Sequence, residues 1–217
     1  MRKKQMAIIM AAAVAVLAVP MNVMAAGSIS GAVDYNNVTA ETTKKAIVGD
    51  KEEMTTESVG VSLSPVTEDI YPSELQEQVD ALNNAWAETT VLDAFLTYFD
   101  ENALPQIDLY DGDGNIVQED MDLSEFKFLS PVMELLLETE PTEENPVDVT
   151  FTANNMTDQI EVFVLHYCDE HKWEMLETEK ISENQVTAGF HSASPVALIY
   201  REIPAEETET DTEVTAP

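Results

Sequence analysis

The sequence has little positive charge, and this shortage excludes one class of partners. It contains 10 Lys and Arg residues against 42 Asp and Glu residues, which gives a formal net charge of −32 at pH 7. Binding to nucleic acids and to anionic lipid depends on Lys and Arg side chains. We therefore expect no nucleic-acid partner. The acidity favours solubility outside the cell, and weak binding of divalent cations or of a basic partner is the alternative.

Cysteine is almost absent. Cys168 is the single cysteine among 217 residues, so an internal disulfide framework is excluded and a packed core has to stabilise the chain. The hydrophobic fraction of 44% is enough for one domain with such a core. Pairing of Cys168 with a second chain stays open, and with it the oligomeric state.

Long apolar runs are scarce too, and one lies near the N-terminus. Residues 1–25 combine a basic start, an apolar run over residues 7–19 and small residues at the end, which is typical of a secretory signal peptide. An uncleaved membrane anchor is the alternative, because residues 5–26 just reach spanning length. Pro20 and Asn22 disfavour the anchor. The sequence thus predicts a secreted, extracellular protein with no membrane span after signal cleavage.

Two polar segments flank the apolar part of the chain. Residues 26–66 are rich in Ser, Thr and Glu, which predicts a flexible acidic arm or linker with at most one strand near residues 59–63. Residues 204–217 alternate acidic residues with Thr and contain no aromatic residue. Such a segment cannot bury enough apolar surface to fold, so it predicts a disordered acidic tail.

Residues 67–102 carry two helical patterns. The first has apolar side chains at intervals of three and four, at Leu75, Val79, Leu82 and Trp86. In the second, Thr90 and Asp93 resemble a capping box in front of an apolar stripe. Such stripes are typical of helices that bury one side. We predict a helical pair that packs on a sheet.

Residues 103–203 change to short strands and turns. Asp-Gly-Asp-Gly at 111–114, between apolar residues at 107–109 and 116–118, predicts a hairpin. Further strands are predicted at residues 126–137 (one strand or two), 147–152, 160–167, 173–181, 186–191 and 196–200. About seven short strands after two helices predict an α+β, β-dominated fold. The predicted architecture is an antiparallel, Ig-like β-sandwich preceded by a short helical pair.

The stretch VLHYCDEHKWEML, residues 164–176, gathers chemically reactive side chains. His166, Cys168 and His171 are weak candidates for a metal or thiol site. Alternation places His166 on a strand and His171 on the loop of a hairpin, so the two imidazoles need not converge. A zinc site requires three or four ligands. The two acids that follow Cys168 raise a thiol pKa rather than lower it, and we predict a plain hairpin.

Two further patterns are weaker. Asp111 and Asp113 lie in a segment similar to a calcium-binding loop, but Leu109 and Asp120 replace two of the defining ligands. A turn built from Asp and Gly is the simpler interpretation. Residues 189–195, GFHSASP, combine a histidine with serines but lack the strand-turn-helix pattern that exposes a hydrolase serine. We therefore expect no catalytic residues, no bound metal and no cofactor.

The C-terminal part resembles a known family. Its blocks VTFT, VLHY, KWE, VTAGF and SPVAL occur in order over residues 147–200, similar to a small β-sandwich module of secreted and wall-associated proteins of Gram-positive bacteria. The resemblance implies an extracellular, all-β module without established catalytic activity. Its pattern marks strands and carries no functional residues over to this chain. In such modules the turn before KW is commonly rich in Asn or Gly, whereas here it comprises residues 168–171.

These observations favour a secreted, non-enzymatic interaction or structural module at the cell surface, with a protein or a glycan as its partner. Two alternatives stay open. One is a carbohydrate-binding sandwich, which requires a row of exposed aromatic residues, and Tyr167, Trp173 and Tyr200 are the candidates. The other is a metal or thiol site at Cys168 and His171.

Overall fold

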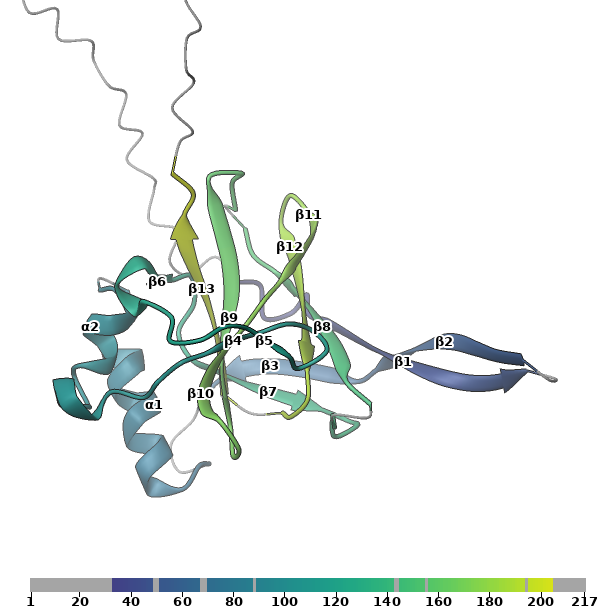
Figure 1. Cartoon of the computed structure of the whole chain (residues 1–217), viewed down its shortest axis with the longest axis horizontal. Helices are drawn as coiled ribbons and strands as arrows, with labels where there is room; N and C mark the ends of the chain where they lie inside the picture. The colour runs from purple at the N-terminus through teal and green to yellow at the C-terminus, as the bar shows by residue number, and fades with distance from the viewer. Residues whose placement is uncertain are drawn as a thin grey trace, which may run out of the picture.

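The chain folds into two β-sheets, with two α-helices in its described part (Figure 1). The computed structural model describes residues 33–48, 51–66, 70–87, 89–142, 145–154, 156–193 and 195–204. The predicted signal peptide, residues 1–25, and residues 205–217 of the predicted tail lie outside the described residues. No helix in the described ranges is long and apolar enough to cross a membrane.

The smaller sheet has five strands in the order β11-β12-β8-β1-β2, and each neighbouring pair is antiparallel. Their bounds are β1 Thr39–Val48, β2 Lys51–Val59, β8 Val147–Thr152, β11 Glu179–Ser182 and β12 Gln185–Phe190. The sheet forms one layer of the molecule, and its inner side chains face the larger sheet.

The larger sheet has eight strands in the order β3-β7-β13-β9-β10-β4-β5, with β6 beside β13. Their bounds are β3 Val61–Pro65, β4 Leu109–Tyr110, β5 Ile116–Gln118, β6 Lys127–Phe128, β7 Met133–Leu137, β9 Ile160–Cys168, β10 Lys172–Leu176 and β13 Pro195–Glu202. β4 and β10 run parallel, whereas β9 is antiparallel to both of its neighbours. The predicted class, a β-dominated α+β sandwich, is confirmed.

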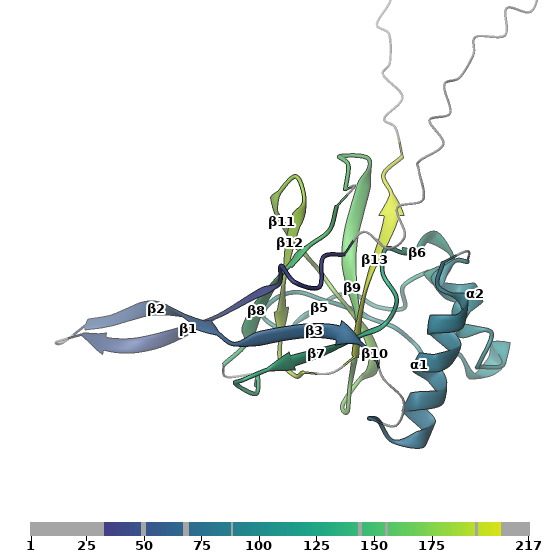
Figure 2. The ribbon, with the colours of Figure 1, turned by 180° about the vertical axis from the view of Figure 1, so that it is seen from behind.

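The central strand β9 separates two hydrophobic cores. Val162 and Val164 join the core between the two sheets, whereas Phe163 and Leu165 join the core on the helical side. This alternation follows from the period of two residues in a strand. Figures 1 and 2 show the same three layers, with the smaller sheet on one side of the larger sheet and the helices on the other.

The two helices close the second core. α1, Ser73–Ala85, buries Leu75, Val79 and Leu82 as its spacing predicts. α2, Val91–Phe95, begins where Thr90 Oγ1 accepts a hydrogen bond from the Asp93 backbone N–H at 3.1 Å, so the predicted cap is confirmed. The helical pair therefore covers one face of the larger sheet.

One tryptophan joins the helical layer to the sheet. Trp173 of β10 is 1% exposed, and its Nε1 donates a hydrogen bond to Gln78 Oε1 of α1 at 2.8 Å. Its ring meets the rings of Phe95 and Tyr167 edge to face, with centroids 5.6 and 5.4 Å away. A buried indole N–H requires such a partner, so this hydrogen bond fixes α1 over β10.

The prediction of a flexible arm over residues 26–66 is wrong for its described part, which contains β1, β2 and β3. β1 pairs with β2 from Ala40 opposite Val59 to Val48 opposite Lys51, and the hairpin projects from the body on the side opposite the helices (Figures 1 and 2). No other described element lies beside its outer half (Figures 1 and 2), so the sequence needs no apolar alternation there. Thr and Val still favour extended backbone, and that preference outweighs the polar composition.

Residues 126–137, predicted as one strand or two, form two strands, and the single strand predicted at residues 173–181 is divided. Residues 126–137 form β6 and β7, and residues 173–181 form β10 and β11, which belong to different sheets. The chain crosses between the sheets at Glu177 and Thr178, where Thr178 Oγ1 donates to the Val162 carbonyl at 2.7 Å. The hairpin around residues 111–114 is confirmed, because β4 pairs antiparallel with β5.

Asp148 provides a pH-dependent test of the smaller sheet. It lies directly opposite Glu41 on β1. Its pKa is raised by loss of hydration between the strands and then by repulsion from Glu41. The ionised form of Asp148 therefore lowers the free energy of unfolding once pH rises above the unfolded pKa of the group, near 4. We expect Asp148→Asn to stabilise the protein at pH 7.5 by less than about 1 kcal/mol, because the residue stays partly accessible to solvent, which screens the repulsion.

Thermal unfolding of this variant at two pH values is the measurement. The melting temperature should rise by about 1–3 °C at pH 7.5 and stay unchanged at pH 3, where the carboxyl group is protonated in both states. Glu177→Gln, which removes one charge from an exposed position, is the control for net charge. An equal gain in both variants contradicts the specific effect of Asp148.

Candidate functional site

The hairpin β9–β10 forms the centre of the candidate site. Cys168 pairs with Lys172 across it, so residues 169–171 form the turn, and Lys172 adopts the left-handed conformation with φ 64°. The predicted hairpin is confirmed, with a shorter connection than residues 168–172. The same register places Glu174 directly opposite His166. Cross-strand partners have side chains on the same face of the sheet, so these two residues meet.

The expectation that His166 and His171 need not converge is wrong, because both reach Glu174. Glu174 Oε1 lies 2.7 Å from His166 Nδ1, and Oε2 lies 2.7 Å from His171 Nδ1. A carboxylate only accepts hydrogen bonds, so each imidazole donates its Nδ1 proton. His166 reaches the carboxylate through the strand register, and His171 reaches it because the turn folds back over β10.

The carboxyl group of Glu174 is ionised although its side chain is 10% exposed. Burial alone raises its pKa, but hydrogen bonds and charge from His166 and then from His171 outweigh burial, and the net effect lowers the pKa. The other end of this network is buried as well, since His166 is 1% exposed and its ring meets Phe190 edge to face. The network thus extends from the inter-sheet core to the surface.

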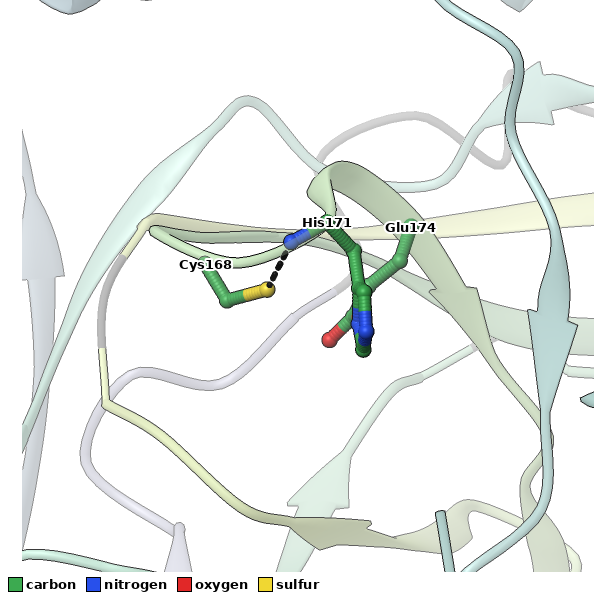
Figure 3. Close-up of side chains that lie close together, drawn as sticks. All are labelled: Cys168, His171 and Glu174. Atoms are coloured by element: carbon green, nitrogen blue, oxygen red, sulfur yellow. Dashed lines mark hydrogen bonds and ion pairs between the residues drawn. The ribbon is translucent and has the colours of Figure 1, made fainter. Parts of the chain in front are cut away.

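Cys168 lies beside this network (Figure 3). Its Sγ accepts a hydrogen bond from the His171 backbone N–H at 3.2 Å. Burial is the main cause that raises the thiol pKa, and the negative charge of Glu174 adds to it. The sequence predicted the same direction but attributed it to Asp169 and Glu170, which are exposed. The thiol is therefore protonated at neutral pH and is a poor nucleophile.

A pocket of about 270 Å³ opens next to the turn. Cys168, His171 and Glu174 line it on one side, and Tyr110 and His191 line it from other elements. Tyr110 stacks on the His171 ring with centroids 4.8 Å apart and planes 13° apart. All three histidines of the sequence thus lie in or next to one site, and the sequence pattern linked only two of them.

The β4–β5 turn positions His191 at the edge of this pocket. A side chain on Gly189 of β12 would come within 2.8 Å of the Gly112 carbonyl, so glycine allows the turn to lie against β12. His191 Nε2 lies 3.2 Å from the same carbonyl. Its Nδ1 is buried and has no hydrogen-bond partner among the described residues. Sequence reasoning assigned no site role to His191, because its proximity to β9–β10 depends on this long-range contact.

Asp111 and Asp113, the calcium candidates, belong to the β4–β5 turn. Asp111 Oδ1 accepts hydrogen bonds from the backbone N–H groups of Asn115 at 2.8 Å and Asp113 at 3.0 Å. These hydrogen bonds, with those from Asn115 the strongest, lower the pKa of Asp111. The carboxylate thus closes the turn, as an Asp at the start of such a turn usually does. Neither aspartate lines the pocket at Cys168.

The aromatic candidates do not form the exposed row that a carbohydrate platform requires. Trp173 is buried, and Tyr167 and Tyr200 are half-buried. Tyr167 also packs against Trp173. Across the described residues, no aromatic side chain is fully exposed. The site therefore offers imidazole, thiol, carboxylate and phenol groups in a pocket rather than a flat aromatic surface.

Comparison with protein-family models, with curated proteins and with solved structures gave no match to this chain. The resemblance of residues 147–200 to a wall-associated module therefore stays a prediction. Functional conclusions for this protein depend on the side chains of the site itself.

Proposed function

We propose that this chain is a secreted, non-enzymatic binding module and that the pocket at the β9–β10 turn is its ligand site. The single observation that carries the proposal is the convergence of Glu174, His171 and Cys168 at one surface pocket. Polar groups that converge in a concave site are typical of ligand binding. The N-terminal pattern over residues 1–25 supports secretion.

The state of these groups supports binding rather than catalysis. Catalysis by Cys168 requires a base that removes the thiol proton, whereas Glu174 raises the thiol pKa. Both oxygens of Glu174 already accept hydrogen bonds from His166 and His171, so the carboxylate is not a free general base. A preorganised, buried network of this kind is suited to holding a ligand in place.

The test uses protein recovered from the culture medium after expression of the full chain. Zinc chloride, an N-acetylglucosamine oligosaccharide and an oligolysine peptide serve as probes in thermal unfolding. We expect at least one probe to raise the melting temperature by about 5 °C or more at 100-fold excess over its dissociation constant.

Ser192→Trp, which fills the pocket from its rim, should abolish that shift. The control is Ser182→Trp on the exposed strand β11, and it should keep the shift. The proposal fails if no probe binds, or if the probe that binds does so equally well to Ser192→Trp. Recovery of the protein only from cells contradicts the secretion half of the proposal.

A further inference from the structure

The side chains of Cys168, His171 and Glu174 form a compact set of potential metal ligands. One ligand atom from each residue lies within 4.8 Å of the other two, and Figure 3 shows the three side chains together at the turn. The set combines sulfur, nitrogen and oxygen donors. Calcium and magnesium prefer oxygen donors alone, whereas zinc binds thiolate, imidazole and carboxylate in tetrahedral sites.

We propose that the turn pocket binds Zn²⁺ through Cys168 Sγ, the His171 imidazole and a Glu174 carboxylate oxygen. This inference rests on the proposed function and names the ligand of the same site. The three residues recur at intervals of three along the chain, and all belong to one hairpin. A single well-paired unit therefore positions the complete set, and no distant segment has to move to assemble it.

The surroundings of the set orient it as metal sites require. His166 holds the second oxygen of Glu174 at 2.7 Å from within the core, which is the role of a second shell that fixes a metal-binding carboxylate. Tyr110 stacks on the His171 ring and fixes its plane. Contacts that do not depend on a metal thus hold both Glu174 and His171 in place.

Only small movements separate the observed geometry from a zinc site. Zinc–ligand bonds of about 2.0–2.3 Å place tetrahedral ligand atoms roughly 3.5 Å apart. The nitrogen–oxygen pair of His171 and Glu174 has to open from 2.7 Å, and Cys168 Sγ has to move inward. His171 lies in an exposed turn with its side chain 41% exposed, so its ring has room to adjust.

The charge and polarity of the pocket also favour a cation. Asp169 and Glu170 line it together with Glu174, and the chain as a whole carries a formal charge of −32. Such a field raises the local concentration of cations. His191, whose buried Nδ1 has no hydrogen-bond partner among the described residues, lines the same pocket and offers another nitrogen donor there.

Binding of Zn²⁺ releases one proton to solvent and moves a second within the network. The thiol proton of Cys168 leaves to solvent as the zinc–sulfur bond forms. Zinc takes the place of the proton between His171 Nδ1 and Glu174, and that proton moves to Nε2, so the imidazole stays neutral. No oxidation or reduction is involved, and no further reactant is needed.

The test is titration of the purified secreted protein with zinc chloride by calorimetry, in the presence of millimolar calcium to occupy exposed acids. We expect one strong site per chain. Cys168→Ala and His171→Ala should each weaken binding by at least about 100-fold, since even second-shell changes cost about 10–100-fold. Asp169→Asn removes an acid of the same pocket that is outside the ligand set, and it should keep the affinity within a few fold.

Cobalt chloride gives a readout on the parent protein, which does not depend on how the variants fold. Co²⁺ bound to the parent protein should show thiolate-to-metal charge-transfer absorption in the near ultraviolet, and Cys168→Ala should lack it. The inference is overturned if the parent shows no such absorption, or if zinc binds all three variants equally. In that case, binding of the oligosaccharide or of oligolysine in the pocket leaves the proposed function standing, whereas failure of every probe removes both.

Discussion

Replacement of Trp173 with alanine is expected to lower the free energy of unfolding by about 3–5 kcal/mol, the range for removal of a buried large aromatic side chain. The ring is 1% exposed and lies between α1, α2 and β9. Its loss leaves a cavity where the helical layer meets the sheet, and it also leaves the Gln78 amide without its indole partner. Urea unfolding followed by far-ultraviolet circular dichroism measures the change.

Trp173→Phe separates packing from hydrogen bonding. Phenylalanine keeps most of the ring contacts with Phe95 and Tyr167 but cannot donate to Gln78, so we expect a smaller cost of about 1–3 kcal/mol. If Trp173→Ala cost no more than the phenylalanine variant, the tryptophan would not hold the helices on the sheet. Trp86 stays as an intrinsic fluorophore in both variants.

Replacement of Glu174 with alanine is expected to lower the free energy of unfolding by about 3 kcal/mol or more, because Glu174 is the partner that both histidines share in a buried, charged network. The carboxylate connects His166 and His171, with both distances at 2.7 Å. Its removal takes a charged acceptor from both imidazoles at once. The measurement is urea unfolding at pH 7.5 with a chelator present, so that bound metal does not contribute to stability.

Loss of His171 should destabilise the protein much less than loss of Glu174. His171→Ala removes the exposed half and should cost less than about 1 kcal/mol in the same buffer, because solvent replaces the lost contact. Glu177→Ala changes an exposed acid three residues further along and should stay within about 0.5 kcal/mol of the parent. Equal costs for Glu174→Ala and Glu177→Ala would mean that the two histidines do not depend on the carboxylate.

The sequence predicts those elements whose apolar spacing is set by burial. The alternation in residues 160–167 correctly assigns Val162 and Val164 to one face and Phe163 and Leu165 to the other. The helical spacing of Leu75, Val79 and Leu82 is correct for the same reason. The β1–β2 hairpin escapes detection because an unpacked ribbon needs no apolar face, so its Thr-rich strands resemble a polar linker.

Local sequence patterns predict the candidate site only in part. A hairpin turn and a cluster of reactive side chains are competing interpretations of residues 168–171 in the sequence. The structure contains both, because the turn itself brings Cys168 and His171 to Glu174. Glu174 meets His166 because of the pairing register of the two strands, and this register depends on the length of the turn. The sequence predicts a longer turn than the structure has. Tyr110 and His191 join the pocket through contacts between segments far apart in sequence, and local patterns carry no record of those contacts.

Strand β9 has a consequence for how this protein can change over evolution. Its side chains supply both hydrophobic cores in alternation and one of them, His166, supports the Glu174 network. Single substitutions alter one core at a time. Insertion or deletion of one residue in its middle, by contrast, would exchange the side chains that face the two cores over the rest of the strand and place His166 on the face opposite Glu174. The length of this strand is therefore under tighter constraint than its composition.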